Sequence, residues 1–158
     1  MARGRAVERF EREARDRGLS IEVREFPQGT KTAEAAARAV GCEVGQIVKS
    51  LVFVADGRPL VALTSGANRA DTVRLAAALG VSEVRRASPE EARDATGFAI
   101  GGTPPFGYRG PVRVLMDREL LGYDLLWAAA GTPQAVFPIG PDDLIRASGA
   151  EPADFRES

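Results

Sequence analysis

The chain has 158 residues, 44% of them hydrophobic, and a formal net charge of -1 at pH 7. This length can bury a core without disulfides, and the mixed composition excludes wholesale disorder. Broad nonspecific nucleic-acid binding depends on neutralising many phosphates, so the near-zero charge argues against it, although a local basic face stays open. We therefore expect one domain spanning residues 1–158.

The sequence contains no histidine and a single cysteine, Cys42. Catalytic triads that depend on imidazole are therefore excluded, and the commonest metal ligand is missing. A single cysteine cannot form an internal disulfide, and no cysteine cluster is present for zinc. We expect neither a metal nor a cofactor. No apolar run approaches the roughly eighteen residues of a membrane span and the amino terminus lacks an apolar signal core, so we expect a cytoplasmic protein without membrane contact.

Hydrophobic periodicity and capping residues predict the elements in chain order. Helices are expected at 3–17, 33–40, 72–79, 89–97 and 141–147. Strands are expected at 19–24, within 45–55, and at 60–64, 83–87, 111–116, 125–129 and 134–139. Asp56-Gly57 predicts a tight hairpin turn. The tail, residues 151–158, is expected to fray.

Lys49 lies within the apolar stretch 45–55, an unusual place for an ammonium group. Alternation puts Lys49 on one strand face with Ile47 and puts Ser50 on the other, and both faces are apolar. An isolated buried ammonium costs on the order of several kcal/mol, so it needs a partner or a wet cavity. We predict a functional cavity there; the alternative is a lysine near the strand end whose amine reaches water.

Polar residues gather at the end of the predicted hairpin that carries Lys49. Thr64, Ser65 and Asn68 follow the returning strand directly. We predict them as secondary substrate-binding candidates, with simple turn formation as the alternative.

A second informative stretch is the glycine- and proline-rich segment 97–107. Adjacent Gly101 and Gly102 let backbone N–H groups converge on one point, and the following prolines stiffen the loop. Such a loop can hold an anion or an oxyanion. The spacing matches neither the dinucleotide fingerprint nor the P-loop, and the alternative is an ordinary connection.

Four motifs occur in order: TKTAE at 30–34, IVKSLVF at 47–53, GGTPPFG at 101–107 and PDDLI at 141–145. Together they resemble the YbaK/prolyl-tRNA synthetase-associated editing-domain family, over about residues 21–149. The resemblance implies an α/β fold whose mixed, largely antiparallel, barrel-like sheet is flanked by helices. It also implies a free-standing protein that hydrolyses mischarged aminoacyl-tRNA in trans.

In that family the strand lysine and the glycine loop belong to the active site, so the resemblance assigns catalytic roles to Lys49, Gly101 and Gly102. Further candidate substrate-binding residues are Ser50, Thr103, Pro105, Thr132 and Val136. The implied partners are the acceptor end of an aminoacyl-tRNA, expected to be tRNA(Pro) or a related tRNA, and, as an open alternative, an aminoacyl-tRNA synthetase. An aminoacyl ester is already activated, so positioning and charge stabilisation can supply much of the rate, with a substrate group activating the water.

The region 131–137 carries neither the acidic residue of family members that remove cysteine nor the histidine of those that remove alanine. A pocket formed by Val136 and Phe137 would favour a small apolar side chain. An apolar pocket separates substrates by only about 1–3 kcal/mol per methylene, so the amino acid stays unassigned. Two rival functions stay open: a non-catalytic module that binds tRNA or a synthetase, and a nucleotide or phosphate binder that uses the Gly101 loop.

Overall fold

The computed structural model describes residues 4–30 and 32–158. Lys31, in the first of the four motifs, lies outside the described residues, as does the start of the first predicted helix. The described chain forms five α-helices: α1 (Arg5–Asp16), α2 (Ala33–Val40), α3 (Thr72–Leu79), α4 (Pro89–Thr96) and α5 (Pro141–Ser148). None of them is long and apolar enough to cross a membrane.

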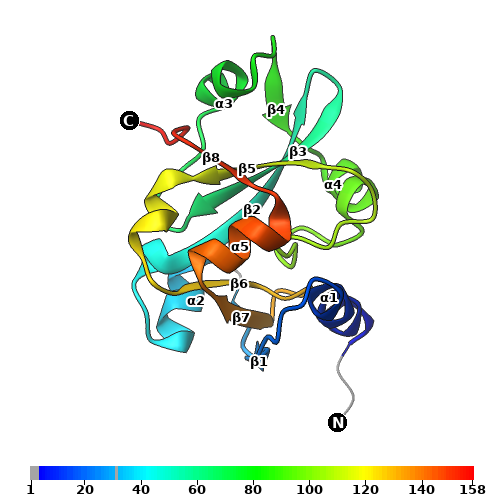
Figure 1. Cartoon of the computed structure of the whole chain (residues 1–158), viewed down its shortest axis with the longest axis vertical. Helices are drawn as coiled ribbons and strands as arrows, with labels where there is room; N and C mark the ends of the chain where they lie inside the picture. Colours follow the sequence, from blue (N-terminus) through cyan, green and yellow to red (C-terminus); the bar gives the residue numbers. More distant parts are fainter. Residues whose placement is uncertain (1–3, 31) are drawn as a thin grey trace.

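The strands are β1 (Arg24–Glu25), β2 (Ile47–Ala55), β3 (Arg58–Ser65), β4 (Val84–Arg86), β5 (Arg113–Asp117), β6 (Leu126–Ala129), β7 (Ala135–Ile139) and β8 (Glu151–Ala153). Two 3-10 turns, η1 (Val44–Gln46) and η2 (Arg118–Gly122), precede β2 and follow β5. All eight strands belong to one sheet of order β1-β7-β6-β2-β3-β5-β8, with β4 also pairing with β2. Figure 1 shows β2 running through the middle of the molecule with helices around it.

The sheet is mixed, which confirms the predicted fold class. β2 pairs antiparallel with β3 and β4, and β7 pairs antiparallel with β1 and β6. The pairs β2–β6, β3–β5 and β5–β8 are parallel. The β2–β3 hairpin turns at Asp56 and Gly57, whose φ angles of 46° and 81° are the positive values that a two-residue hairpin of this type needs.

The neighbours of β2 differ between its two edges, and this difference positions the site. Along one edge β3 pairs with β2 from Val48 to Ala55. Along the other edge β6 covers only Ile47 and Val48, and β4 covers only Phe53 to Ala55. The middle of β2 is therefore left without a strand on that side.

Apolar side chains pack on both sides of the sheet. On one side three buried rings meet: Phe10 of α1 lies 4.9 Å, centroid to centroid, from both Phe106 and Phe137 of β7. On the other side Phe53 and Leu75 of α3 pack with Phe155. Phe10 and Phe106 thus join α1 to the glycine-rich segment 97–107.

The predicted strand at 19–24 is wrong for most of its length, because only Arg24 and Glu25 pair with a neighbour, β7. Leu19 and Val23 are nevertheless buried in the core. The alternating pattern correctly predicted which side chains are buried. It did not predict the backbone pairing, because these residues are buried without a ladder of backbone hydrogen bonds.

The predicted fraying of the tail is also wrong. β8 pairs with β5, and Phe155 is fully buried. The Asp71 amide, which precedes α3, donates a hydrogen bond to the Phe155 carbonyl oxygen at 2.7 Å. A single buried aromatic in a short polar segment gives too weak a periodic signal to be recognised in the sequence.

The predicted start of α4 is confirmed by a capping box. Ser88 Oγ accepts from the Glu91 amide at 3.1 Å, and Glu91 Oε1 accepts from the Ser88 amide at 2.9 Å. We expect Ser88→Ala to lower the free energy of unfolding by about 1 kcal/mol, the usual cost of a lost cap. Urea denaturation measures it, with exposed Ser82→Ala as the control; equal stabilities of the two variants would contradict the capping role.

Candidate active site

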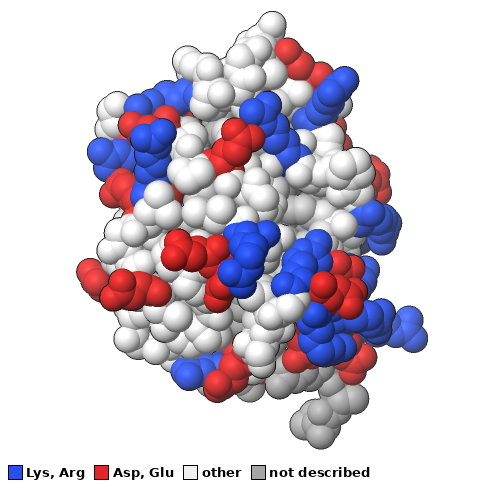
Figure 2. Space-filling view, in the orientation of Figure 1, with Lys and Arg blue, Asp and Glu red and all other residues white. Residues whose placement is uncertain are grey.

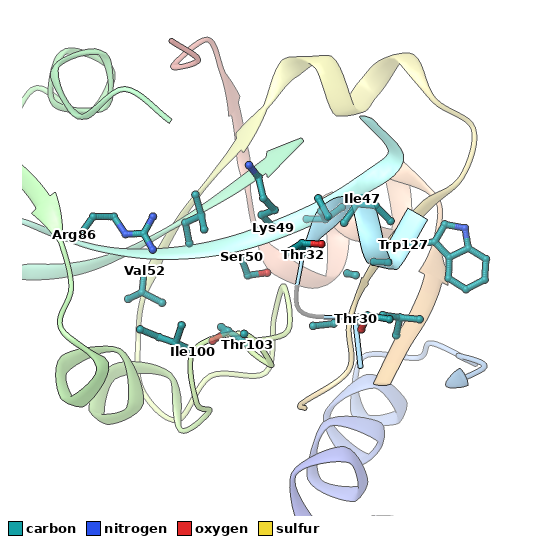
Figure 3. A pocket seen from close by; sticks show the side chains of 18 residues that line it. Thr30, Thr32, Ile47, Lys49, Ser50, Val52, Arg86, Ile100, Thr103 and Trp127 are labelled. Atoms are coloured by element: carbon teal, nitrogen blue, oxygen red, sulfur yellow. The ribbon is translucent and has the colours of Figure 1, made fainter. Parts of the chain in front are cut away.

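A cavity of about 280 Å³ opens where β2 lacks a neighbouring strand. Its walls come from the start of α2, from β2, β6 and β7, from the end of β4 and from the glycine-rich segment. Five of the predicted site residues line it: Lys49, Ser50, Gly101, Thr103 and Val136. Residues far apart in the sequence are thus brought together around the middle of β2 (Figure 3).

Lys49 is half-buried, and its Nζ donates a hydrogen bond to the Asn68 carbonyl oxygen at 2.5 Å. Desolvation lowers the pKa of the Lys49 ammonium; Glu34 of α2 opposes this shift, and Arg69 adds to it. The predicted partner for the buried charge therefore exists, and it is a backbone carbonyl. The Lys49 ammonium is therefore a stronger acid than a solvent-exposed lysine, because Glu34 offsets only part of the effect of burial.

Lys49 and the glycine loop line the cavity from opposite sides of β2. In Figure 3 the Lys49 side chain rises on one side of the strand, whereas Ser50 points to the other side, toward Ile100 and Thr103. The assignment of Lys49, Gly101 and Gly102 to one active site implies an amine that faces the amides of the glycine loop. The alternation of side chains along β2 instead separates them, so the strand itself lies between the charge and the loop.

Behind Lys49 lies a polar network that the sequence did not reveal. Asn68 Nδ2 donates to Asp117 Oδ2 and to Glu119 Oε2, both at 2.9 Å. The Ser65 amide donates to the same Asp117 oxygen at 3.1 Å, and Asp117 is only 2% exposed. Asp117 thereby fixes the segment whose carbonyl holds Lys49. The only local signal was a carboxylate at the end of an apolar strand.

The other predicted residues of this hairpin end do not line the cavity. Thr64 is fully buried and donates to the Ala62 carbonyl oxygen, and Ser65 Oγ donates to the Gly45 carbonyl oxygen. Asn68 contributes through its backbone carbonyl. The prediction that Thr64, Ser65 and Asn68 contact substrate is therefore not supported by their positions, and these residues support the lysine from behind.

Of the two loop glycines only Gly101 lines the cavity. The Gly102 amide donates to the Ala99 carbonyl oxygen at 3.1 Å, so it is occupied within a turn. A Cβ atom at Gly102 would lie 2.6 Å from Thr132 Cα, which explains the glycine by close packing between two loops. The predicted pair of converging amides is thus reduced to one.

The remaining predicted site residues of the two loops are Thr103, Pro105 and Thr132, and each makes contacts that stabilise a loop. Thr103 Oγ1 donates to the Ala99 carbonyl oxygen at 3.2 Å while its residue lines the cavity. Pro105 is buried away from the cavity, and Thr132 packs behind Gly102. Thr132 and Pro105 therefore hold the loop in place rather than reach the cavity.

We expect Gly102→Ala to destabilise the protein by about 1–3 kcal/mol, the usual cost of overpacking, and to displace the loop that carries Gly101. The reason is that the nearest atoms, Thr132 Cα and the Gly131 carbonyl oxygen at 2.8 Å, are backbone and cannot rotate away. Thermal unfolding measures the effect. The control is Gly110→Ala, where an added Cβ would meet nothing within 4 Å; indistinguishable melting of the two variants would contradict the packing role.

Several cavity residues were not predicted as site residues. Thr30 and Thr32 flank the start of α2, where Thr32 Oγ1 accepts from the Ala35 amide at 3.0 Å and caps the helix. Arg86 of β4 stacks over the Phe53 ring at 5.4 Å, and Trp127 of β6 forms part of the apolar wall. Their position depends on strand pairing between distant segments, which local patterns do not report. Within residues 4–30 and 32–158 no group of three or more metal-ligating side chains is gathered.

Comparisons with known proteins agree with this architecture. The chain matches the aminoacyl-tRNA editing domain family over residues 27–147. The crystal structure of a candidate trans-editing enzyme for prolyl-tRNA synthetase is 44% identical and superposes with a TM-score of 0.94, covering 99% of this chain and 100% of that one.

Curated relatives include full-length synthetases and a small protein. The proline–tRNA ligase of Nitratidesulfovibrio vulgaris (strain DP4) is 37% identical over 94 residues, which is 60% of this chain and 16% of the ligase. The uncharacterized protein YwhH of Bacillus subtilis (strain 168) is 29% identical over 124 residues, 78% of each chain. The chain thus spans about a sixth of the ligase that it matches.

Fold, cavity and sequence similarity together define a tRNA-editing type of α/β domain. The chain belongs to the aminoacyl-tRNA editing domain family.

Proposed function

We propose that the protein is a deacylase acting in trans, which hydrolyses the ester bond of a mischarged tRNA, tRNA(Pro) or a related tRNA carrying a small amino acid. What supports this most is a cavity that Lys49, Ser50 and Gly101 all line, in a chain that covers the whole of a candidate trans-editing enzyme. The proline–tRNA ligases that contain a similar segment point to the same tRNA.

In the proposed reaction, a water oxygen attacks the ester carbonyl carbon, the bond to the ribose oxygen breaks, and that oxygen takes up a proton. The products are a free amino acid and an uncharged tRNA. Lys49 would attract the negative charge of the acceptor end, and the exposed Gly101 would let the substrate approach the backbone closely. The chain has no histidine, so a ribose hydroxyl or the α-amino group of the substrate would activate the water.

The size and walls of the cavity support a small amino acid. Its volume of about 280 Å³ lies at the lower end of ligand sites, and Ile47, Trp127 and Val136 give it an apolar wall. Each additional methylene changes binding by only about 1–3 kcal/mol, so we propose selection by size with incomplete discrimination among small side chains.

Charge on the surface supports recognition of the acceptor end over a broad contact with the tRNA body. Figure 2 shows basic and acidic side chains interspersed on the face that it draws. Mixed charge of this kind gives little long-range attraction for a polyanion. A synthetase partner that presents the tRNA is therefore part of the proposal.

The test is single-turnover deacylation of tRNA(Pro) charged with alanine, cysteine, serine or proline. We expect hydrolysis of at least one species with a small noncognate amino acid and protection of the prolyl species. If every charged tRNA is bound without hydrolysis, the protein is a binding module of the same fold. If adenosine nucleotides bind and no charged tRNA does, the nucleotide-binding alternative replaces the proposal.

A further inference from the structure

One residue of β2, Ser50, lies opposite the break between two neighbouring strands. β6 ends its pairing at Val48, and β4 begins its pairing at Phe53. The cavity occupies this break, so its wall includes the bare edge of a central strand. A sheet edge inside a protein normally finds a hydrogen-bonding partner.

The direction of the backbone groups follows from two hydrogen bonds. In a strand the N–H and C=O of one residue point to the same edge, and the next residue points to the opposite edge. The Ile47 carbonyl accepts from the Gly66 amide at 2.7 Å, on the β3 side, and the Val52 carbonyl accepts from the Ala87 amide at 3.1 Å, on the β4 side. Ser50 comes two residues before Val52, so its N–H and C=O point to the same edge of β2 as those of Val52, the edge that faces β4.

The N–H and C=O of Ser50 therefore point into the cavity. Neither of them pairs with β6, because the parallel register ends at Val48 opposite Ala128, and neither pairs with β4. Among the residues that the structure describes, the hydrogen bonds of turns, loops and caps do not involve either group.

The side chain of Ser50 is enclosed, so the backbone is the part of Ser50 that a ligand in the cavity can reach. Its Oγ exposes less than 1 Å² and has no hydrogen-bond partner in the described chain. The Tyr108 phenol lies beside it and donates to the Pro104 carbonyl oxygen at 2.7 Å. Burial raises the pKa of Tyr108 and the neighbouring Ser50 hydroxyl opposes that shift, so the phenol keeps its proton and its oxygen is a polar neighbour of Ser50 Oγ. A buried polar group left unpaired is costly, and native proteins satisfy it with water or a ligand.

We propose that Ser50 is the subsite for the amino-acid part of the substrate, which pairs with it as one residue of an added antiparallel strand would. The Ser50 C=O accepts a hydrogen bond from the α-ammonium group, and the Ser50 N–H donates one to the acyl carbonyl oxygen. An aminoacyl ester carries both groups on one residue, so it can exchange both bonds with Ser50. This assignment rests on the proposed function and adds the group that the site recognises.

The test uses two analogues in which a stable amide replaces the ester: adenosine carrying a 3′-alanylamino group and adenosine carrying a 3′-propionylamino group. They differ by the α-amino group alone. Isothermal titration should show the wild-type protein binding the alanylamino compound at least about tenfold more tightly, since one hydrogen bond to a charged group is lost in the other. Equal affinities would overturn the assignment.

A backbone variant separates the amide from the hydroxyl. Ser50→Pro removes the N–H at a strand position where no ladder bond is lost, a place where proline is tolerated. It should weaken binding of both analogues at least about fivefold, while exposed Ser20→Ala should bind as the wild type does. Wild-type affinity in a folded Ser50→Pro protein would contradict the proposal.

The wild-type protein gives an independent reading if the proline variant fails to fold. Hydrogen exchange of the Ser50 amide should slow when the alanylamino compound is bound, and unchanged exchange at saturation would overturn the subsite. The two proposals fail separately. If the protein discriminates between the analogues but hydrolyses no charged tRNA, the deacylase proposal fails and the Ser50 subsite stands. If it hydrolyses a charged tRNA but binds both analogues equally, the Ser50 subsite fails and the deacylase proposal stands.

Discussion

Replacing Lys49 with alanine is expected to lower the single-turnover deacylation rate at least about 100-fold, the usual loss when one preorganised charged or donor group is removed from a hydrolytic site. The half-buried amine lines the cavity and is held by the Asn68 carbonyl. Arginine should not restore the rate, because a planar guanidinium needs more room than a compact ammonium group.

The control for this variant is another cation. Arg113→Ala alters a half-exposed residue of β5 that lines a separate cavity and should leave the rate unchanged. Thermal unfolding of both variants shows whether the fold is kept. A folded Lys49→Ala protein that deacylates at the wild-type rate would remove Lys49 from the reaction.

The rate should also fall at high pH earlier than an ordinary lysine would allow. Burial lowers the pKa of Lys49 from 10.5, so the ammonium is present below that lowered pKa and is lost as the pH rises through it. The same shift affects stability in the opposite direction: the unfolded chain holds this proton longer, so the Lys49 contribution to stability rises with pH between the folded pKa and 10.5. Rates corrected for spontaneous ester hydrolysis measure the first effect.

Replacing Phe10 with alanine is expected to lower the free energy of unfolding by about 3–5 kcal/mol, the range for deleting a buried ring. Phe10 has no exposed surface, and its ring contacts Phe106 of the glycine-rich segment and Phe137 of β7. The cavity left by the missing ring would weaken the packing of α1 against the glycine-rich segment and against β7.

Urea denaturation measures the loss, with Val73→Ala as the control. Val73 lies on α3 with 76% of its surface exposed, so its truncation should change stability by no more than about 0.5 kcal/mol. Similar losses for the two variants would show that the three rings do not form a common core.

The sequence predicted those features that depend on neighbouring residues. The lysine in an apolar strand, the Asp56-Gly57 turn and the capping box at Ser88 are local, and the structure contains all three. The mixed sheet was an implication of the family resemblance.

Features that depend on distant pairing were not predicted. The break beside Ser50 exists because β6 and β4 end where they do, and neither end is marked in β2 itself. Asp117 reaches Asn68 only through the parallel pairing of β3 with β5. The Gly102 amide looked available because the turn bond to Ala99 and the contact with Thr132 cannot be read from two adjacent glycines.

The most direct measurement is a crystal structure of the protein with the 3′-alanylamino adenosine analogue. We expect the aminoacyl group in the cavity beside Ser50, with the adenosine toward Lys49. Occupancy only of the separate cavity near Arg58 and Arg113, with the space beside β2 empty at saturating analogue, would contradict it.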